Sequence, residues 1–382
     1  MSKNKGNSAG VTAFGIASTY VGAIIGAGYA SGQEILQFFN AFYEKGLIGI
    51  LVATILFIVA AYVPMMLGNR LKCGDYDRVV SLGKSKFPQI FCDVIITFTL
   101  FSTLTIMIAA SGATFNQSFG TPLIVGGIVM SVLMVVSLLA GLDGIVKALS
   151  AVVPIMVIGA FGTAFYFIAN PAPVLDATKE IIVNSSPLIK HWSLSGVLYV
   201  AFNYVVAVAV MISLGQQAKD AKAIRNGALY GGLVLGLCAF ALYTALSKNL
   251  HIVGTSNLPL VDLANSLSPT FGSLYSIILF AGLYSTAISC FFGVYQRFAK
   301  VPALSKLGNN TIIITISVVA LIASMIGFSS LIGYVYPAIG YCGVVILIMN
   351  AMKLSRLEKV AEVELEEEFQ KKEKLATQKN HR

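Results

Sequence analysis

A short stretch near the N-terminus places glycines and polar side chains inside an apolar segment. Residues 22–34 read Gly-Ala-Ile-Ile-Gly-Ala-Gly-Tyr-Ala-Ser-Gly-Gln-Glu and lie within an apolar run from about Val11 to Phe39. Glycine weakens a helix and lets backbones approach closely, and a carboxylate at membrane depth is costly and marks function. A helix that breaks beside Glu34 would free N–H groups for an anion and carbonyl groups for a cation. The stretch therefore predicts a binding site inside a membrane.

The same glycines also fit a packing role. Gly22 with Gly26, and Gly28 with Gly32, have the GxxxG spacing that brings membrane helices together. A packing face does not need the three polar side chains that follow, which favours a helix that unwinds around Gly26 and Gly28. Three interpretations of Glu34 stay open: it neutralises a substrate amine, it couples transport to protons, or it pairs with a polar neighbour.

Later apolar segments carry hydroxyl groups at similar depth. Ser285 and Thr286 lie in the range 269–297, and hydroxyl oxygens are hard ligands that suit a small cation such as Na⁺. The alternative is that they bond to their own helix. Leu100-Phe-Ser-Thr103 also resembles Leu283-Tyr-Ser-Thr286, five predicted helices later, which is the internal echo that a five-plus-five inverted repeat predicts.

The amino-acid composition indicates that membrane-spanning helices position these residues. The chain has 382 residues, of which 57% are hydrophobic and 11% charged, whereas soluble domains have about 25% charged residues. Apolar runs of about 20 residues recur throughout, so we expect an all-α integral membrane protein. The ten predicted spans are 12–40, 46–69, 88–115, 121–140, 145–169, 194–215, 224–248, 269–297, 309–328 and 332–353.

The basic residues predict the orientation of these spans. Of the 26 Lys and Arg residues, 22 fall on the side of the termini and 4 on the other. Lys and Arg are enriched in cytoplasmic loops, which places both termini in the cytoplasm of a multi-pass cell-membrane protein. The formal charge of +9 is then an orientation signal and not a nucleic-acid site, so the expected surroundings are the lipid bilayer and a small-molecule substrate.

The predicted organisation follows from these spans. Residues 258–267 are apolar at helical spacing, which predicts a short amphipathic helix that either covers an outward vestibule or lies at the interface without a gating role. The five predicted parts are a cytoplasmic N-terminus (1–10), a first five-helix repeat (11–169), an extracellular connection (170–193), a second five-helix repeat (194–353) and a charged cytoplasmic tail (354–382).

Enzyme chemistry has little support in the sequence. The three histidines lie in predicted loops or the tail, and no Ser/His/Asp set, phosphate-binding glycine loop or metal-ligand cluster is present. The five cysteines form no CxxC pair and are interpreted as reduced and largely buried. We therefore expect no enzymatic activity and no cofactor, apart from Na⁺ or H⁺ as a coupling ion.

Two motifs resemble known membrane proteins. Residues 22–28, Gly-Ala-Ile-Ile-Gly-Ala-Gly, resemble the first-helix glycine motif of the amino acid–polyamine–cation superfamily. The extension to Glu34 is similar to the YkvI-type membrane proteins of that superfamily, which implies an amino acid permease. Residues 280–285, Phe-Ala-Gly-Leu-Tyr-Ser, resemble the eighth-helix sodium motif of LeuT-fold symporters. The resemblance implies a LeuT-like fold in which the first and sixth helices are both broken at mid-membrane.

The resemblance also implies roles for individual residues. A sodium ion would be bound by the carbonyl groups of Gly22, Ile25 and Ala281 and the hydroxyl group of Ser285. Tyr284 stands where sodium symporters usually have a hydroxyl-bearing Thr or Ser, and Thr286 would compensate. The implied substrate-binding residues are Gly26, Ala27, Gly28, Tyr29, Ser102, Phe202, Asn203 and Tyr204. Relatives usually have glycine at the break of the sixth helix, where this chain has Phe202-Asn203-Tyr204.

The predicted function is cation-coupled symport of a small amino acid or a related zwitterion or amine. Alternating access would come from rocking of one helix bundle around a fixed site. One alternative keeps the fold but makes the chain a receptor or complex subunit that binds a metabolite without transporting it. A passive channel is disfavoured because the polar residues form isolated islands and not a continuous pore.

Overall fold

Helices make up nearly all of the described structure. The computed structural model describes residues 10–74, 87–140, 152–173, 181–302 and 307–380. Seven helices in these ranges are long and apolar enough to cross a membrane, and Ala13–Ile24, Pro154–Ala169 and Asn309–Ser324 are shorter apolar helices. The all-α membrane class is confirmed, whereas the count of ten spans stays a prediction. The predicted loop and terminal cations that lie outside the described residues are Lys3, Lys5, Arg78, Lys84, Lys86, Lys147, Lys179, Lys306 and Arg382.

Each predicted span overlaps at least one helix. The first span consists of α1 (Ala13–Ile24), α2 (Ala27–Ser31) and α3 (Gln33–Phe38), followed by the 3-10 helix η1 (Asn40–Phe42). The rest of the first half contains α4 (Lys45–Leu71), α6 (Phe87–Phe119), α7 (Leu123–Ala140) and α9 (Val152–Ala169). The second half contains α10 (Trp192–Gln217), α11 (Ala221–Ser247), α12 (Leu250–Val253), α13 (Pro259–Leu267), α14 (Pro269–Ala299), α16 (Asn309–Ser324) and α17 (Phe328–Asn380).

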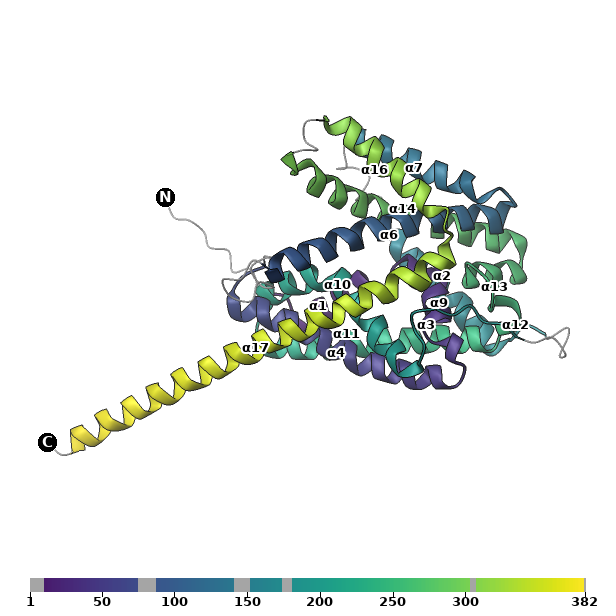
Figure 1. The fold of residues 1–382 in the computed structure, drawn as a ribbon. Helices are drawn as coiled ribbons and strands as arrows, with labels where there is room; N and C mark the ends of the chain where they lie inside the picture. The colour runs from purple at the N-terminus through teal and green to yellow at the C-terminus, as the bar shows by residue number, and fades with distance from the viewer. Residues whose placement is uncertain (1–9, 75–86, 141–151, 174–180, 303–306, 381–382) are drawn as a thin grey trace, which may run out of the picture.

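The long helices form two packed groups. One group contains α1, α4, α10 and α11, and the other contains α6, α7, α14 and α16. Figure 1 shows the second group above the first. Each group takes two neighbouring spans from each half of the chain, which is the arrangement that a five-plus-five repeat predicts. The inverted symmetry itself stays a prediction.

Glycines explain how closely the first group packs. A Cβ atom on Gly68 of α4 would lie 2.1 Å from the carbonyl oxygen of Ile212, and one on Gly215 of α10 would lie 1.9 Å from that of Met65. Small residues let membrane helices approach to backbone contact and maximise their van der Waals packing. The two glycines therefore fix α4 against α10 at the ends that lie near Lys72 and Lys219.

The helix bundle has a basic side and an opposite side. The basic side is the face at which α1 begins, α4 and α10 end, and α14 ends at Ala299. The N–H group of Val11 donates to the carbonyl oxygen of Gln217 at 2.9 Å, which joins the start of the chain to this face. The opposite side carries η1, α12, α13 and the first turns of α14 and α17. Residues 259–267 form the helix predicted there.

The predicted break in the sixth span is wrong. Helix α10 is continuous from Trp192 to Gln217. Its centre, Tyr199-Val-Ala-Phe-Asn-Tyr204, contains neither glycine nor proline, so nothing weakens the backbone there. The amide of Asn203 donates to the carbonyl oxygen of Tyr199 at 2.9 Å and so adds a bond within the helix.

Pro337 in α17 frees a carbonyl group that the connection before α10 binds. Pro337 lies inside this helix and has no N–H group, so the carbonyl group of Gly333, four residues earlier, loses its helical donor. The hydroxyl group of Ser186 donates to that carbonyl oxygen at 2.5 Å. The connection before α10 is thereby fastened to the start of α17. At its other end, α17 continues through the charged tail to Asn380 and projects from the body in Figure 1.

Candidate functional site

The first span is interrupted twice. Helix α1 ends at Ile24, Ile25 and Gly26 have extended backbones, and α2 begins at Ala27. Gly32 has a φ of 78°, a left-handed conformation that glycine adopts readily, and it separates α2 from α3. The predicted break is confirmed, although the extended residues are 25–26 and Gly28 lies within α2. The interruption at Gly32 was not predicted.

The first interruption leaves backbone groups without helical partners. Among the described residues, no hydrogen bond is found for the N–H groups of Gly26 and Ala27 or for the carbonyl oxygens of Gly22 and Ile25. In lipid such groups are tolerated only where they line a cavity or bind something. Free N–H groups of this kind suit an anion, and free carbonyl groups suit a cation.

The carboxylate of Glu34 is packed against α2. Glu34 is 5% exposed and lies in the first turn of α3. A Cβ atom on Gly28 would lie 1.6 Å from its Oε1 atom, so the carboxylate occupies the space that any larger residue at position 28 would fill. The hydroxyl group of Tyr199 donates to Oε2 at 3.4 Å, which is a long bond. No ion pair to Glu34 is found among the described residues.

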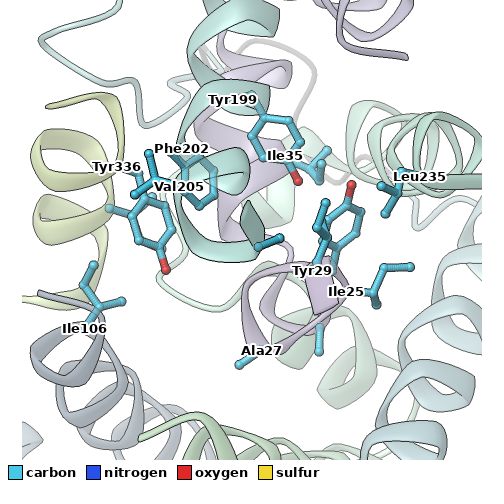
Figure 2. Packing of buried hydrophobic residues seen from close by; sticks show 14 of the residues in the cluster. Ile25, Ala27, Tyr29, Ile35, Ile106, Tyr199, Phe202, Val205, Leu235 and Tyr336 are labelled. Atoms are coloured by element: carbon cyan, nitrogen blue, oxygen red, sulfur yellow. The ribbon is translucent and has the colours of Figure 1, made fainter. Parts of the chain in front are cut away.

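An aromatic cluster holds Tyr199 in place. Its ring packs against Phe39 with centroids 5.0 Å apart and against Tyr29 at 6.3 Å. Phe202 of the same helix stacks on Tyr336 of α17 at 4.3 Å, with an interplanar angle of 13°. Figure 2 shows Tyr29 and Tyr199 on one side of this region and Phe202 and Tyr336 on the other. The cluster fixes the hydroxyl group of Tyr199 beside Glu34.

A cavity of about 480 Å³ lies between the two helix groups. Its wall includes Glu34 and both sides of the first interruption. Val206 and Val210, which also line it, are 47% and 40% exposed, and both lie on the half of α10 that ends on the basic side. The lining is therefore buried at Glu34 and exposed on the half of α10 that ends on the basic side, so the cavity opens there.

Ten of the fourteen predicted site residues line this cavity: Gly22, Ile25, Gly26, Ala27, Gly28, Glu34, Phe202, Asn203, Ser285 and Thr286. They come from α1, α2, α3, α10 and α14 and from the interruption between α1 and α2. The structure thus brings residues together that are up to 264 positions apart in the sequence. Their roles in binding stay predictions.

Four predicted residues lie outside the described lining. Tyr204 is two residues from Phe202 and therefore on the far side of α10, where its hydroxyl group accepts a bond from the amide of Asn350 at 2.5 Å. Tyr29 is buried on the far side of α2 against Tyr199. Ser102 is buried on α6 beside the lining residue Thr103. Ala281 lies one helical turn before Ser285 on α14, nearer the opposite side, and is not among the lining residues.

Several lining residues were not predicted. They include Thr103 with Met107 on α6 and Val206 with Val210 on α10. In both pairs the residues are four positions apart, which places them on one helix face. A helical-face analysis centred on Phe202 and Asn203 would have found the second pair. Whether Tyr336 lines the cavity depends on how α17 packs against the other helices. The sequence around Tyr336 contains no pattern that predicts this position.

Hydrogen bonds close the opposite side. The hydroxyl group of Tyr275 on α14 donates to the carbonyl oxygen of Ala30 at 2.5 Å, which joins α2 to the other helix group. The side-chain amide of Gln33 donates to the hydroxyl group of Ser329 at 2.9 Å, and that of Gln37 donates to the same hydroxyl group at 2.8 Å. Helices α2 and α3 are therefore bonded to α14 and α17.

Helix α13 covers the second interruption. A Cβ atom on Gly32 would lie 3.1 Å from Leu260 and 3.3 Å from Pro259, so α13 packs directly on this glycine. The amide of Gln117 on α6 donates to both carboxylate oxygens of Asp262, at 3.1 and 3.0 Å. Burial raises the pKa of Asp262, and the bonds from Ser256 and Gln117 oppose that rise. The predicted short helix thus contacts the broken span.

An ion pair lies within the second helix group. Asp93 on α6 pairs with Arg297 on α14 at 3.4 Å, near the basic side. Both residues belong to one helix group, so the pair does not join the two groups. The five cysteines all lie in described residues, and no disulfide joins them. The prediction that they are largely buried is wrong, because Cys92 is buried and the other four are half-buried.

Two bacterial proteins are similar to the chain in sequence, and no family model matches it. The chain is 26% identical over 326 residues to the uncharacterized membrane protein YkvI of Bacillus subtilis (strain 168), covering 85% of this chain and 91% of that protein. It is 28% identical over 341 residues to the uncharacterized protein YyaD of the same organism, covering 86% and 93%. The resemblance to YkvI-type proteins therefore extends over most of the chain.

A solved structure shares the architecture. The inward-facing conformation of Mhp1 has a TM-score of 0.62 to the chain at 14% identity, covering 89% of this chain and 76% of that protein. Mhp1 is described as a nucleobase-cation-symport-1 family transporter. At this identity the likeness establishes the fold, which is LeuT-like. The chain is thus an all-helical membrane protein that shares its fold with Mhp1.

Proposed function

We propose that the chain is a cation-coupled secondary transporter of a small amino acid or a related zwitterion or amine. The observation that carries this proposal is the cavity between the two helix groups. It reaches the interrupted first helix and the Glu34 carboxylate, and it opens toward the basic side while hydrogen bonds close the opposite side. A site that is reached from one side at a time is what alternating access requires.

The orientation of the chain in the membrane decides whether this conformation is inward-facing or outward-facing. The distribution of Lys and Arg places the basic side in the cytoplasm, so the cavity represents the inward-facing state. The Mhp1 structure that shares the fold is also inward-facing. To reach the outward-facing state, the protein would then have to break the hydrogen bonds of Tyr275, Gln33 and Gln37 on the opposite side.

Two positions are proposed for the coupling ion. The residues Gly22, Ile25, Ser285 and Thr286 line the same cavity. Their carbonyl and hydroxyl oxygens are ligands that suit Na⁺. The bond from Thr286 to the carbonyl oxygen of Gly282 is long, at 3.4 Å, so that hydroxyl group remains accessible to an ion. Glu34 is the proposed position for a coupling proton.

Uptake into proteoliposomes tests the proposal. Purified protein is reconstituted, and accumulation of radiolabelled amino acids and amines is followed under an imposed Na⁺ or H⁺ gradient. If Na⁺ is the coupling ion, Ser285→Ala lowers Na⁺-driven accumulation at least tenfold. Ser273→Ala removes an exposed hydroxyl group from the same helix and serves as the matched control. If H⁺ is the coupling ion, Glu34→Gln retains exchange but loses gradient-driven accumulation.

The same assay separates the receptor alternative. A receptor would bind a ligand, seen as a rise in the thermal stability of the purified protein, yet show no accumulation or exchange under either gradient. That combination would refute the transport proposal while leaving the binding site intact.

A further inference from the structure

Glu34 is a buried acceptor that lacks sufficient donors. An ionised carboxylate has about four lone-pair positions, and the described partner is one hydroxyl group at 3.4 Å. The other oxygen lies 1.6 Å from the place that a Cβ atom on Gly28 would take, and no hydrogen-bond donor to it is found among the described residues. Glu34 is only 5% exposed, yet it lines the cavity. It is therefore held ready for a donor that enters the cavity.

The described part of the cavity wall contains no basic side chain to meet a charge on Glu34. Of the described lining residues, none is Lys, Arg or His, and Glu34 is the acidic one. Burying a carboxylate without a cation is costly. A ligand ammonium group would supply both the opposite charge and three N–H donors.

The remaining wall suits the same kind of ligand. The rings of Phe202 and Tyr336 are stacked and line the cavity, and aromatic faces attract cations. Met107, Ile25 and Ile339 add apolar surface for an aliphatic body. A volume of about 480 Å³ has room for a small organic molecule.

The position of Glu34 also disfavours a ligand carboxylate. An anion in the cavity would bind the N–H groups freed by the first interruption. These groups are close to Gly28, and Oε1 of Glu34 lies directly beside that residue. A carboxylate bound at these groups would be repelled by the Glu34 charge a few ångströms away. The cavity therefore separates ligands by charge.

We propose that the cavity binds small primary or secondary amines through an ion pair with Glu34 and discriminates against ligands that carry a carboxylate. This inference rests on the proposed function for the assignment of the cavity as a substrate site. It narrows the substrate class from amino acids and amines to amines.

Four-carbon probes that differ in charge test this proposal. Binding of n-butylamine, butyrate and L-2-aminobutyrate to the purified full-length protein is measured by calorimetry and by thermal stability. We expect n-butylamine to bind at least tenfold more tightly than the other two. Glu34→Gln should weaken n-butylamine binding at least tenfold, Glu34→Asp should retain part of it, and Asp93→Asn, which removes a carboxylate outside the cavity, should leave it unchanged.

The outcomes are decisive in both directions. Equal or tighter binding of butyrate or L-2-aminobutyrate would overturn the proposal, as would unchanged n-butylamine binding by a folded Glu34→Gln protein. The proposal would also fail if n-butylamine did not bind at about 10 mM, far above a millimolar dissociation constant. Amine binding without uptake would refute transport alone, whereas uptake confined to carboxylate-bearing substrates would refute the amine preference alone.

Discussion

Substitution of Gly28 by alanine tests whether the Glu34 carboxylate is held where ligands reach it. The added Cβ atom would lie 1.6 Å from Oε1, and ordinary van der Waals contact begins at about 3.4 Å. The oxygen must therefore move by about 1.8 Å. It is the far end of a flexible side chain, and alanine favours the helix at this position, so we expect the protein to fold and Glu34 to rotate away.

The expected loss follows from the distance. A charge-assisted hydrogen bond of about 2.8 Å that lengthens by about 1.8 Å is no longer a bond. Bonds to charged groups contribute about 1.5–3 kcal/mol, which corresponds to a loss of about 10- to 150-fold in affinity for n-butylamine. The Glu34→Gln protein should already have lost this interaction, so adding Gly28→Ala to it should cost little more.

Calorimetric titration of the four proteins of this cycle measures the coupling. Gly162→Ala is the matched control because a Cβ atom there meets nothing within 4 Å and the residue lies on α9, outside the cavity lining. Full affinity in Gly28→Ala would refute the reasoning. Additive losses in the double variant would also refute it, since they would mean that the two residues act independently.

Three further predictions concern contacts outside the cavity lining. Tyr275→Phe removes the hydrogen bond from α14 to α2, worth about 1 kcal/mol, and should lower the population of the state described about fivefold. Maleimide should then label the cavity residue Cys290 more slowly, in a protein that has no other cysteine. An unchanged labelling rate would show that the bond does not stabilise this state. Because burial raises the pKa of Asp262 in the folded protein, its stabilising contribution is complete below the unfolded pKa of about 3.9 and is lost as the pH rises through the folded value. The melting temperature should therefore fall, relative to that of Asp262→Asn, as the pH is raised from about 4 to 7, and a parallel pH dependence of the two proteins would contradict this. Asp93→Asn should cost at most about 1 kcal/mol in thermal unfolding because its pair with Arg297 is half-exposed, and a larger cost would mean that the pair does more than lie on the surface.

The location of the site was predictable because its signals are local. Glycine in an apolar run weakens the helix wherever the run packs, so the break near Gly26 follows from the sequence alone. Ser285 and Thr286 were recognisable because hydroxyl groups at depth need partners. By contrast, the break expected in the sixth helix came from a family resemblance and not from its own residues, and the glycine-free segment around Asn203 remained helical.

The remaining wall was not predictable because it depends on rotation and packing. Tyr204 and Phe202 are equally aromatic, but their positions on opposite faces of α10 decide which one reaches the cavity. Tyr336 enters the wall through the way α17 lies against α10. The second interruption, at Gly32, is stabilised by Leu260 and Pro259, more than two hundred residues away, and no local pattern announces such a contact.

The short helix α2 has a consequence for biosynthesis. Five residues do not hold a helix by their own hydrogen bonds, and backbone groups freed at its ends are not tolerated in lipid. The first span should therefore enter the membrane as one unbroken helix and divide only when later elements cover it. Its bond to Tyr275 spans 245 residues, so the ribosome must complete α13 and α14 before the binding site exists.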